Sequence, residues 1–163
     1  MHTIFLALGT NLGDKKAYIT NALISLEKKI DIIKIAPICE TLPVGFSEQD
    51  NFYNTALQAT TYLSPNELLK FIKEVEKKLG RQKRFVNGPR EIDIDIIFYD
   101  NKIIKNTKLS IPHPRMHERD FVLKPIADIA PKTIHPIFNK TVQQLLRELP
   151  EEKKAVLTMI EQG

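Results

Sequence analysis

Two aspartates stand two positions apart in the segment GPREIDIDIIFYD, residues 88–100. Isoleucines alternate with them, the pattern of a β-strand whose successive side chains point to opposite faces. Asp93 and Asp95 would then share one face, about 6–7 Å apart. Two carboxylates there can hold Mg²⁺ on a polyphosphate, because this cation takes one or two carboxylates and fills its other positions with water and phosphate oxygens. Alternating polar residues on an exposed sheet face would have the same pattern.

Positive charge lies immediately before this strand. Residues 70–90 contain eight Lys and Arg against two Glu, whereas the whole chain has a net charge of +4. The rest of the chain is therefore slightly acidic, and the basic cluster indicates an anionic ligand. Arginines of the predicted loop 81–91 can bind phosphate with paired hydrogen bonds. The lysines before Gly80 are equally well explained as a solvated helix face.

A second cluster, SIPHPRMHER, occupies residues 110–119. Prolines on both sides of His113 stiffen the backbone around the imidazole. Arg115, His117 and Arg119 offer further contacts to an anion, although a solvated helix face explains some of these charges. The H-x-x-x-H spacing also resembles a zinc pair, but no third ligand and no H-E-x-x-H pattern accompany it, which disfavours zinc.

A third cluster combines the segment TLPVG, residues 41–45, with Phe52 and Asn54. Asn54 stands in an otherwise apolar strand, where a buried amide needs hydrogen-bond partners. Its donor and acceptor suit the edge of a heterocycle, and Phe52 has the same strand parity and could stack on such a ring. A core phenylalanine and an asparagine bonded within a turn would explain the two residues equally well.

The elements that position these clusters follow from periodicity and turn residues. Strands are predicted at 3–9, 32–41 with an interruption at Pro37, 52–60 and 92–99, and helices at 14–30 and 65–79. Ser64 and Glu67 form a predicted capping box at the start of the second helix, and Pro65 suits its first helical position. The order βαββαβ predicts an α+β, ferredoxin-like fold, an antiparallel sheet with helices on one face and C-terminal extras. The aspartates would lie on the face that the two main helices leave free.

The C-terminal part is predicted to hold a short strand near 102–104 and helical pieces near 114–119, 121–129 and 141–149, and no role is assigned to the tail EEKKAVLTMIEQG. Residues 1–163 are expected to form a single domain. No apolar run approaches the roughly 18 residues that span a membrane, and the N-terminus does not resemble a signal peptide. Cys39, the one cysteine, is expected to be a small buried core residue, and a cytoplasmic location is expected.

Two other functions fit part of this pattern. One is an RNA-binding module on the open sheet face, although RNA-reading sheets carry aromatic residues where this strand carries aspartates. The other is a metal-dependent phosphohydrolase that uses the same carboxylates.

Taken together, the clusters resemble the 6-hydroxymethyl-7,8-dihydropterin pyrophosphokinase family of folate biosynthesis. The resemblance runs from LALGTNLGD to about Ile129, and it is most specific in GPREIDIDIIFYD and IPHPRMHERDFVLKP. It implies a monomeric enzyme that transfers the β,γ-diphosphate of ATP to the pterin hydroxymethyl group and releases AMP. It implies no nucleic-acid or membrane partner.

The resemblance also implies roles for single residues. Asp93 and Asp95 would hold two Mg²⁺ ions, and Arg81 and Arg90 would stabilise charge on the transferring group. The other implied contacts are Glu76, Arg90, Ser110, His113 and Arg119 for ATP, and Thr41, Val44, Phe52, Asn54 and Phe121 for the pterin, with the two phenylalanines sandwiching its ring.

The loop before the aspartate strand departs from the family pattern. Val86 and Asn87 stand where the family more often has basic and large aromatic residues, and either Lys83 or Arg84 could replace the missing charge. Lys73 stands where a glutamine is common, and Lys108 where an arginine occurs. Segments 43–51 and 81–91 are the expected closing loops.

Overall fold

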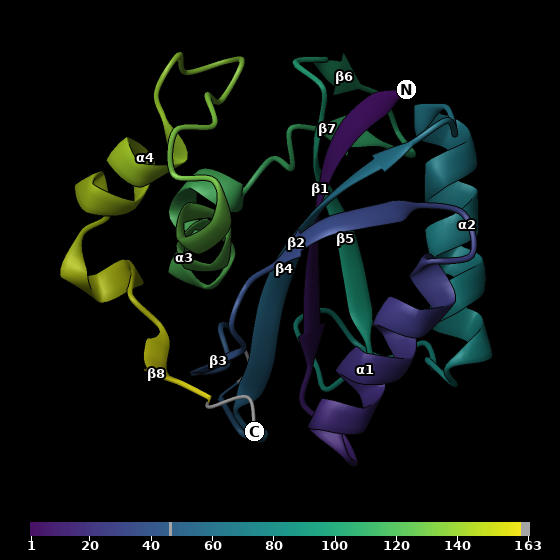
Figure 1. Ribbon diagram of the computed structural model, residues 1–163. Coiled ribbons are helices and arrows are strands. Elements are labelled where there is room, and N and C mark those ends of the chain that lie inside the picture. The colour runs from purple at the N-terminus through teal and green to yellow at the C-terminus, as the bar shows by residue number, and fades with distance from the viewer. Residues whose placement is uncertain (46, 161–163) are drawn as a thin grey trace.

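A six-stranded antiparallel sheet carries the aspartate segment in the computed structural model, which describes residues 1–45 and 47–160 (Figure 1). Its order is β5-β1-β4-β3-β8, and β2 also pairs with β4. The ferredoxin-like core predicted from the sequence is confirmed. The strands are β1 His2–Thr10, β2 Asp31–Ile35, β3 Cys39–Thr41, β4 Phe52–Thr61, β5 Asp93–Tyr99 and β8 Val156–Met159.

Helices cover both faces of the sheet, and Figure 1 shows the three layers. The two main helices pack on one face, as predicted, and the C-terminal extras pack on part of the other. The second face of the sheet, which α1 and α2 leave free, is therefore partly covered by the C-terminal helices. The helices are α1 Lys15–Leu26, α2 Pro65–Lys78, α3 Asp120–Ile129 and α4 Val142–Glu148, with short 3₁₀ turns η1 Met116–Glu118 and η2 Glu151–Lys153.

Local sequence signals set most helix ends. The Ser64 hydroxyl accepts a hydrogen bond from the Glu67 N–H while the Glu67 carboxylate accepts one from the Ser64 N–H, so the predicted capping box is confirmed. Gly80, at φ 92°, follows the end of this helix. Helix α1 ends earlier than predicted, because its last turn tightens to i→i+3 bonds, yet Ile30 still reaches the core.

The predicted interruption at Pro37 divides one expected strand into β2 and β3. Both pair with β4, with Asp31 opposite Thr60 and Cys39 opposite Asn54. Proline has no N–H for the ladder, which explains the break. Cys39 is fully buried, and burial raises the pKa of its thiol to about 11, in agreement with a structural role.

Strand β5 divides its side chains as predicted. Ile92, Ile94 and Ile96 are buried in the cluster under α1 and α2. A β-bulge follows, since Leu6 of β1 pairs with Ile96 but the preceding residue of β1 pairs with Phe98. The bulge turns Ile97 and Phe98 to the second face, and the Ile97 carbonyl accepts a hydrogen bond from the His113 N–H at 3.2 Å. It thereby attaches the second sequence cluster to the aspartate strand.

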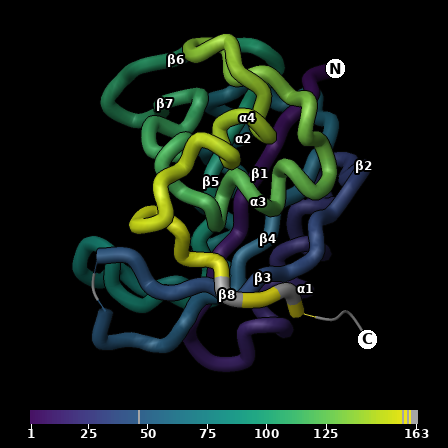
Figure 2. The backbone as a smooth tube through the Cα atoms, turned by 90° about the vertical axis from the view of Figure 1, so that its left-hand side faces the viewer, coloured from purple at the N-terminus to yellow at the C-terminus, as the bar shows by residue number. Residues whose placement is uncertain are grey.

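The short strand predicted near 102–104 lies slightly later, at β6 Ile104–Lys105, whereas the strands β7 Ser110–Ile111 and β8 were not predicted. A separate two-stranded sheet joins β6 to β7 just before His113. The tail, to which the sequence assigned no role, forms β8 beside β3 (Figure 2). Within the described residues, no helix has the length and apolar content needed to cross a membrane.

His135 makes the stability of this fold depend on pH. Its ring is buried against Phe98 and Phe138, and its Nδ1 atom accepts hydrogen bonds from the Ile137 and Phe138 N–H groups. Burial, reinforced by nearby His117, lowers the pKa of His135 to about 4. The neutral ring stabilises the fold above the unfolded pKa of about 6.5, and this stabilisation is lost as pH falls toward 4.

We expect this group to contribute a loss of about 1–3 kcal/mol in the free energy of unfolding between pH 7.5 and pH 4.5. Urea denaturation at both pH values, on the wild type and His135→Gln, would measure it. The variant should have a lower free energy of unfolding than the wild type at pH 7.5, but this free energy should fall less between pH 7.5 and pH 4.5. An unchanged pH dependence in the variant would contradict this assignment.

Candidate active site

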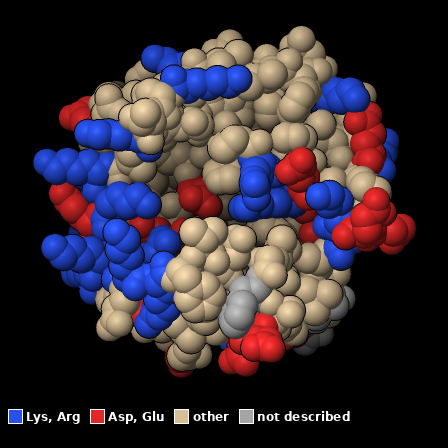
Figure 3. Space-filling model, turned by 180° about the vertical axis from the view of Figure 1, so that it is seen from behind, with Lys and Arg blue, Asp and Glu red and all other residues tan. Residues whose placement is uncertain are grey.

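A cavity opens on the second face of the sheet, between β1, β3, β4, β5 and the start of α3. Figure 3 shows a hollow with acidic atoms at its floor and with Lys and Arg side chains gathered along one side. The cavity brings together all the residues predicted for metal and pterin. The lining residues are Ala7, Leu8, Gly9, Thr41, Leu42, Val44, Phe52, Asn54, Asn87, Arg90, Asp93, Asp95, Arg119, Phe121 and Val122.

Asp93 is held by the two arginines predicted to act with it. Its Oδ1 atom lies 2.7 Å from a guanidinium nitrogen of Arg81, and its Oδ2 atom lies 3.0 Å from one of Arg90. Burial opposes ionisation of this carboxyl, but Arg90 and Arg81 outweigh it and lower its pKa. Both arginines therefore contact the same carboxylate, but only Arg90 lines this cavity, while Arg81 lines a neighbouring surface hollow.

The pKa of Asp95 is shifted in the opposite direction to that of Asp93. Burial first, and then the carboxylates of Asp93 and Glu76, raise the pKa of Asp95 to about 7. Within residues 1–45 and 47–160 its carboxylate has no hydrogen bond or ion pair. A carboxylate pair in which one member lacks an ion-pair partner among the described residues fits a bound cation.

The metal would have few protein ligands. In the described part of the chain, no group of three or more His, Cys, Asp or Glu side chains could enclose an ion. Asp93 and Asp95 would hold Mg²⁺ from one side, and phosphate and water oxygens would complete its shell, which is how proteins usually bind this cation. The donor set therefore fits Mg²⁺ carried with a polyphosphate.

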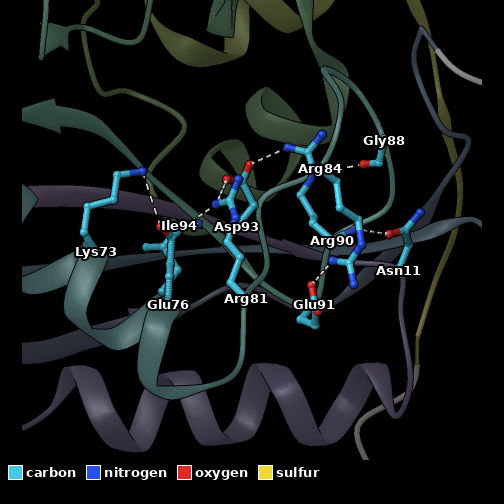
Figure 4. A network of polar contacts seen from close by, with 10 residues as sticks. All are labelled: Asn11, Lys73, Glu76, Arg81, Arg84, Gly88, Arg90, Glu91, Asp93 and Ile94. Carbon is cyan, nitrogen blue, oxygen red and sulfur yellow. Dashed lines mark hydrogen bonds and ion pairs between the residues drawn. The ribbon is translucent and has the colours of Figure 1, made fainter.

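Glu76 orients Arg81, and Figure 4 shows the two side chains next to each other. The carboxylate is buried, and its Oε2 atom accepts hydrogen bonds from Arg81 at 2.7 Å and from the Ile94 N–H at 2.8 Å. Lys73, on the same helix, lies 3.3 Å from its Oε1 atom. Glu76 thus attaches α2 to β5 and aims Arg81 at Asp93.

The structure separates the two basic candidates of the loop. Arg84 pairs with Glu91, a largely buried carboxylate, and the pair lies apart from Asp93 in Figure 4. Lys83 has no hydrogen bond or ion pair within the described residues and lines the same surface hollow as Lys73 and Arg81. Of the two, Lys83 is the residue whose charge has no partner among the described residues.

The residues predicted for the pterin meet at the other end of the cavity. Asn54 donates a hydrogen bond to the Thr41 hydroxyl at 2.7 Å, and both side chains are buried. Gly9 makes room, because a Cβ atom there would lie 2.6 Å from the Asn54 Oδ1 atom. Phe52 and Phe121 line the same space, each 5.5 Å from an arginine guanidinium. A flat polar heterocycle suits these walls.

The predicted ATP contacts are spread more widely. Arg90 and Arg119 line the main cavity, whereas Ser110 and His113 line a neighbouring one. Burial, then the charge of Arg119, lowers the pKa of His113 to about 4, so its ring is neutral at pH 7. His117, also predicted as an anion contact, packs edge-on against Phe138.

Asn11 is a site residue that the sequence did not single out. Its fully buried amide donates to the Gln49 side chain at 2.8 Å and to the Asp50 carbonyl at 3.0 Å, and its Oδ1 atom accepts from the Arg90 N–H at 2.9 Å. The only signal was an asparagine in the turn after the first strand. Asn11 thus joins the start of the chain to both predicted closing loops.

Asn87, where the loop departs from the family pattern, also joins the two loops. Its carbonyl accepts from the Gln49 side chain at 2.8 Å, and a Cβ atom on Gly45 would lie 2.6 Å from its amide nitrogen. Asn87 has φ 59°, a left-handed conformation that asparagine tolerates well.

Residues 5–131 match the family described as 7,8-dihydro-6-hydroxymethylpterin-pyrophosphokinase. The chain belongs to this family. Transfer of a diphosphate from ATP to hydroxymethyldihydropterin in folate synthesis, expected from the sequence, is the activity of this pyrophosphokinase family.

Relatives of the pyrophosphokinase differ in length. The chain is 45% identical to the 2-amino-4-hydroxy-6-hydroxymethyldihydropteridine pyrophosphokinase of Aquifex aeolicus, over 91% of this chain and 92% of that protein. It is 50% identical to the Folic acid synthesis protein FOL1 of Dictyostelium discoideum, over 90% of this chain but only 22% of that protein.

Solved structures agree with the fold. A crystal structure of Plasmodium falciparum HPPK-DHPS superposes with a TM-score of 0.72 over 90% of this chain and 44% of that chain. The two sequences are 19% identical, so this likeness concerns the fold alone.

Proposed function

We propose that this pyrophosphokinase acts through Mg²⁺ held by Asp93 and Asp95, with ATP as the donor and hydroxymethyldihydropterin as the acceptor. The observation that carries the proposal is the uncompensated carboxylate of Asp95 beside an arginine-bound Asp93, at the floor of a cavity whose other end is lined by Asn54 and Phe52. Two Mg²⁺ ions, when bound, would neutralise the phosphates and bring them close to the carboxylates.

The reaction exchanges one P–O bond for another. The pterin hydroxyl oxygen forms a bond to the β-phosphorus of ATP, the bond from that phosphorus to the α,β-bridging oxygen breaks, and AMP leaves. The hydroxyl proton passes to a carboxylate of the floor or to solvent. Arg81 and Arg90, already aimed at Asp93, would stabilise charge on the transferring group, and Glu76 would hold Arg81 in place.

The remaining roles follow the position of each residue. Ser110, His113 and Arg119 would contact the nucleotide, and Lys83 rather than Arg84 would supply the extra basic contact of the loop. Thr41, Val44 and Asn54 would recognise the edge of the pterin, between Phe52 and Phe121. A single domain over residues 1–163, a monomeric state and a cytoplasmic location remain predictions from the sequence.

Strand β5 carries aspartates where RNA-reading sheets carry aromatic residues, which argues against the RNA-binding alternative. The phosphohydrolase alternative would use the same carboxylates but needs no pterin site. The paired Thr41 and Asn54 side chains at the far end of the cavity favour the transferase.

Incubation with ATP, Mg²⁺ and hydroxymethyldihydropterin tests the proposal. We expect AMP to form in amounts equal to the pterin diphosphate, and only when the pterin is present. ADP or free phosphate as the product, or turnover without pterin, would contradict it. Salt-dependent RNA binding without ATP consumption would favour the binding module.

Replacing Asn54 by alanine tests the pterin end separately. The variant loses the donor to Thr41 and the amide that faces a heterocycle, so we expect the KM for pterin to rise about 10–100-fold. The KM for ATP should change less than about threefold. Steady-state kinetics with each substrate varied would measure both values, and an equal rise in both would contradict the assignment of Asn54 to the pterin.

A further inference from the structure

The C-terminal segment connects the two walls of the proposed pterin end of the cavity. One wall is the end of β3 with Thr41 and Leu42, and the other is the start of α3 with Phe121. Figure 2 shows β8 lying beside β3, and the ladder places Val156 opposite Thr41. The sequence assigned no role to this segment.

Asp120, the first residue of α3, holds this segment through hydrogen bonds to its backbone. The residue is 4% exposed, and both carboxylate oxygens accept hydrogen bonds from the Ala155 N–H at 2.9–3.0 Å. Its Oδ2 atom also accepts a hydrogen bond from the Val156 N–H at 3.0 Å. No lysine or arginine pairs with it in the described part of the chain. A buried carboxylate at the start of a helix is stabilised by such N–H donors and by the helix dipole.

Further hydrogen bonds join the C-terminal segment to the wall of the cavity formed by the end of β3. The Ala155 carbonyl accepts a hydrogen bond from the Leu42 N–H at 2.8 Å, and the Ile160 N–H donates to the Ile38 carbonyl at 2.7 Å. Thr41 then accepts the hydrogen bond of Asn54. A chain of polar contacts therefore runs from Asp120, through the C-terminal segment, to the amide that faces the cavity.

We propose that Asp120 and residues 155–160 position the pterin-binding wall, an inference that rests on the proposed function. Strand β3 is three residues long and is followed by a loop, so one ladder with β4 would leave it prone to local opening. The second ladder, anchored by Asp120, holds Thr41 and Leu42 against the cavity. The same anchor fixes Phe121, the next residue along the chain. Asp120 is thus a positioning residue for the pterin.

Asp120→Asn in the full chain tests this, with Asp128→Asn, an ion-paired carboxylate at the other end of the same helix, as the matched control. Titrations would use hydroxymethyldihydropterin and a non-hydrolysable ATP analogue with Mg²⁺. We expect the Kd for pterin to rise about 10-fold in the Asp120 variant, equivalent to about 1.4 kcal/mol. The Kd for the analogue should stay within about twofold, and amide exchange at Leu42 and Val156 should become faster.

Ala155→Pro removes the shared N–H donor while leaving the carboxylate, and it should reproduce the selective loss of pterin affinity. Faster exchange at Leu42 with unchanged pterin affinity would overturn the inference, as would an equal loss of nucleotide affinity. A wild-type chain that bound the analogue but no pterin would instead overturn the proposed function. The control variant should behave as the wild type in all three measurements.

Discussion

Replacing Asp95 by asparagine is expected to lower the rate of AMP formation by about 10³-fold or more, because a metal site with one of its two carboxylates neutralised loses several kcal/mol of charge stabilisation. The substitution keeps the size of the side chain, so the loss would come from charge. Rates at saturating Mg²⁺ and ATP would measure it. Asp31→Asn, an exposed aspartate in β2, is the control and should keep full activity.

The same substitution should change stability in the opposite direction. Ionisation of Asp95 destabilises the folded chain, since its folded pKa of about 7 lies above the usual 3.8. Stability is therefore lost as pH rises between these values, and the neutral amide avoids that loss. We expect Asp95→Asn to increase the free energy of unfolding at pH 8 by about 1–3 kcal/mol in metal-free buffer. A variant that lost both activity and stability would indicate a structural role for Asp95 instead.

Replacing Arg81 by alanine is expected to lower the rate of AMP formation by about 10²–10³-fold. Arg81 bridges Asp93 and Glu76, so its loss removes a charge from the transferring group and leaves two carboxylates facing each other. Arg81→Lys keeps the charge, but its ammonium ends a side chain of different length and lacks the planar guanidinium, so it should recover only part of the rate. Single-turnover measurements with both variants would separate the chemical step from substrate binding.

Arg84→Ala provides the matched comparison for this loop. Arg84 pairs with Glu91, so its loss should lower the melting temperature by leaving a largely buried carboxylate unpaired, while the rate changes by less than about threefold. An equal loss of rate in the Arg81 and Arg84 variants would contradict the division of the loop into a catalytic and a structural arginine.

The sequence by itself determined the elements whose signals are local. Alternation placed Asp93 and Asp95 on one face of β5, the capping box started α2, and Pro37 marked the break between two strands. Family motifs then indicated which residues lie together, and the cavity is lined by all of those expected for metal and pterin. These features depend on neighbours within a few positions, where strand and helix periods are strict.

Only the tertiary structure decided which partner each charge has. Arg84 pairs with Glu91, Glu76 orients Arg81, and the bulge at Ile97 attaches His113 to the aspartate strand. No periodic pattern contains this information, because each contact joins residues from different elements at distances set by packing.

The C-terminal strand β8 is the clearest case of a contact that the sequence alone does not predict. Its sequence is short and ordinary, and its position depends on the buried carboxylate of Asp120 and on the unpaired edge of β3. Neither is visible until the chain has folded, because an edge strand accepts a partner from any part of the sequence that can reach it. The aspartates of the site could therefore be predicted from the sequence. The position of the C-terminal segment beside β3 could be known only from the folded structure.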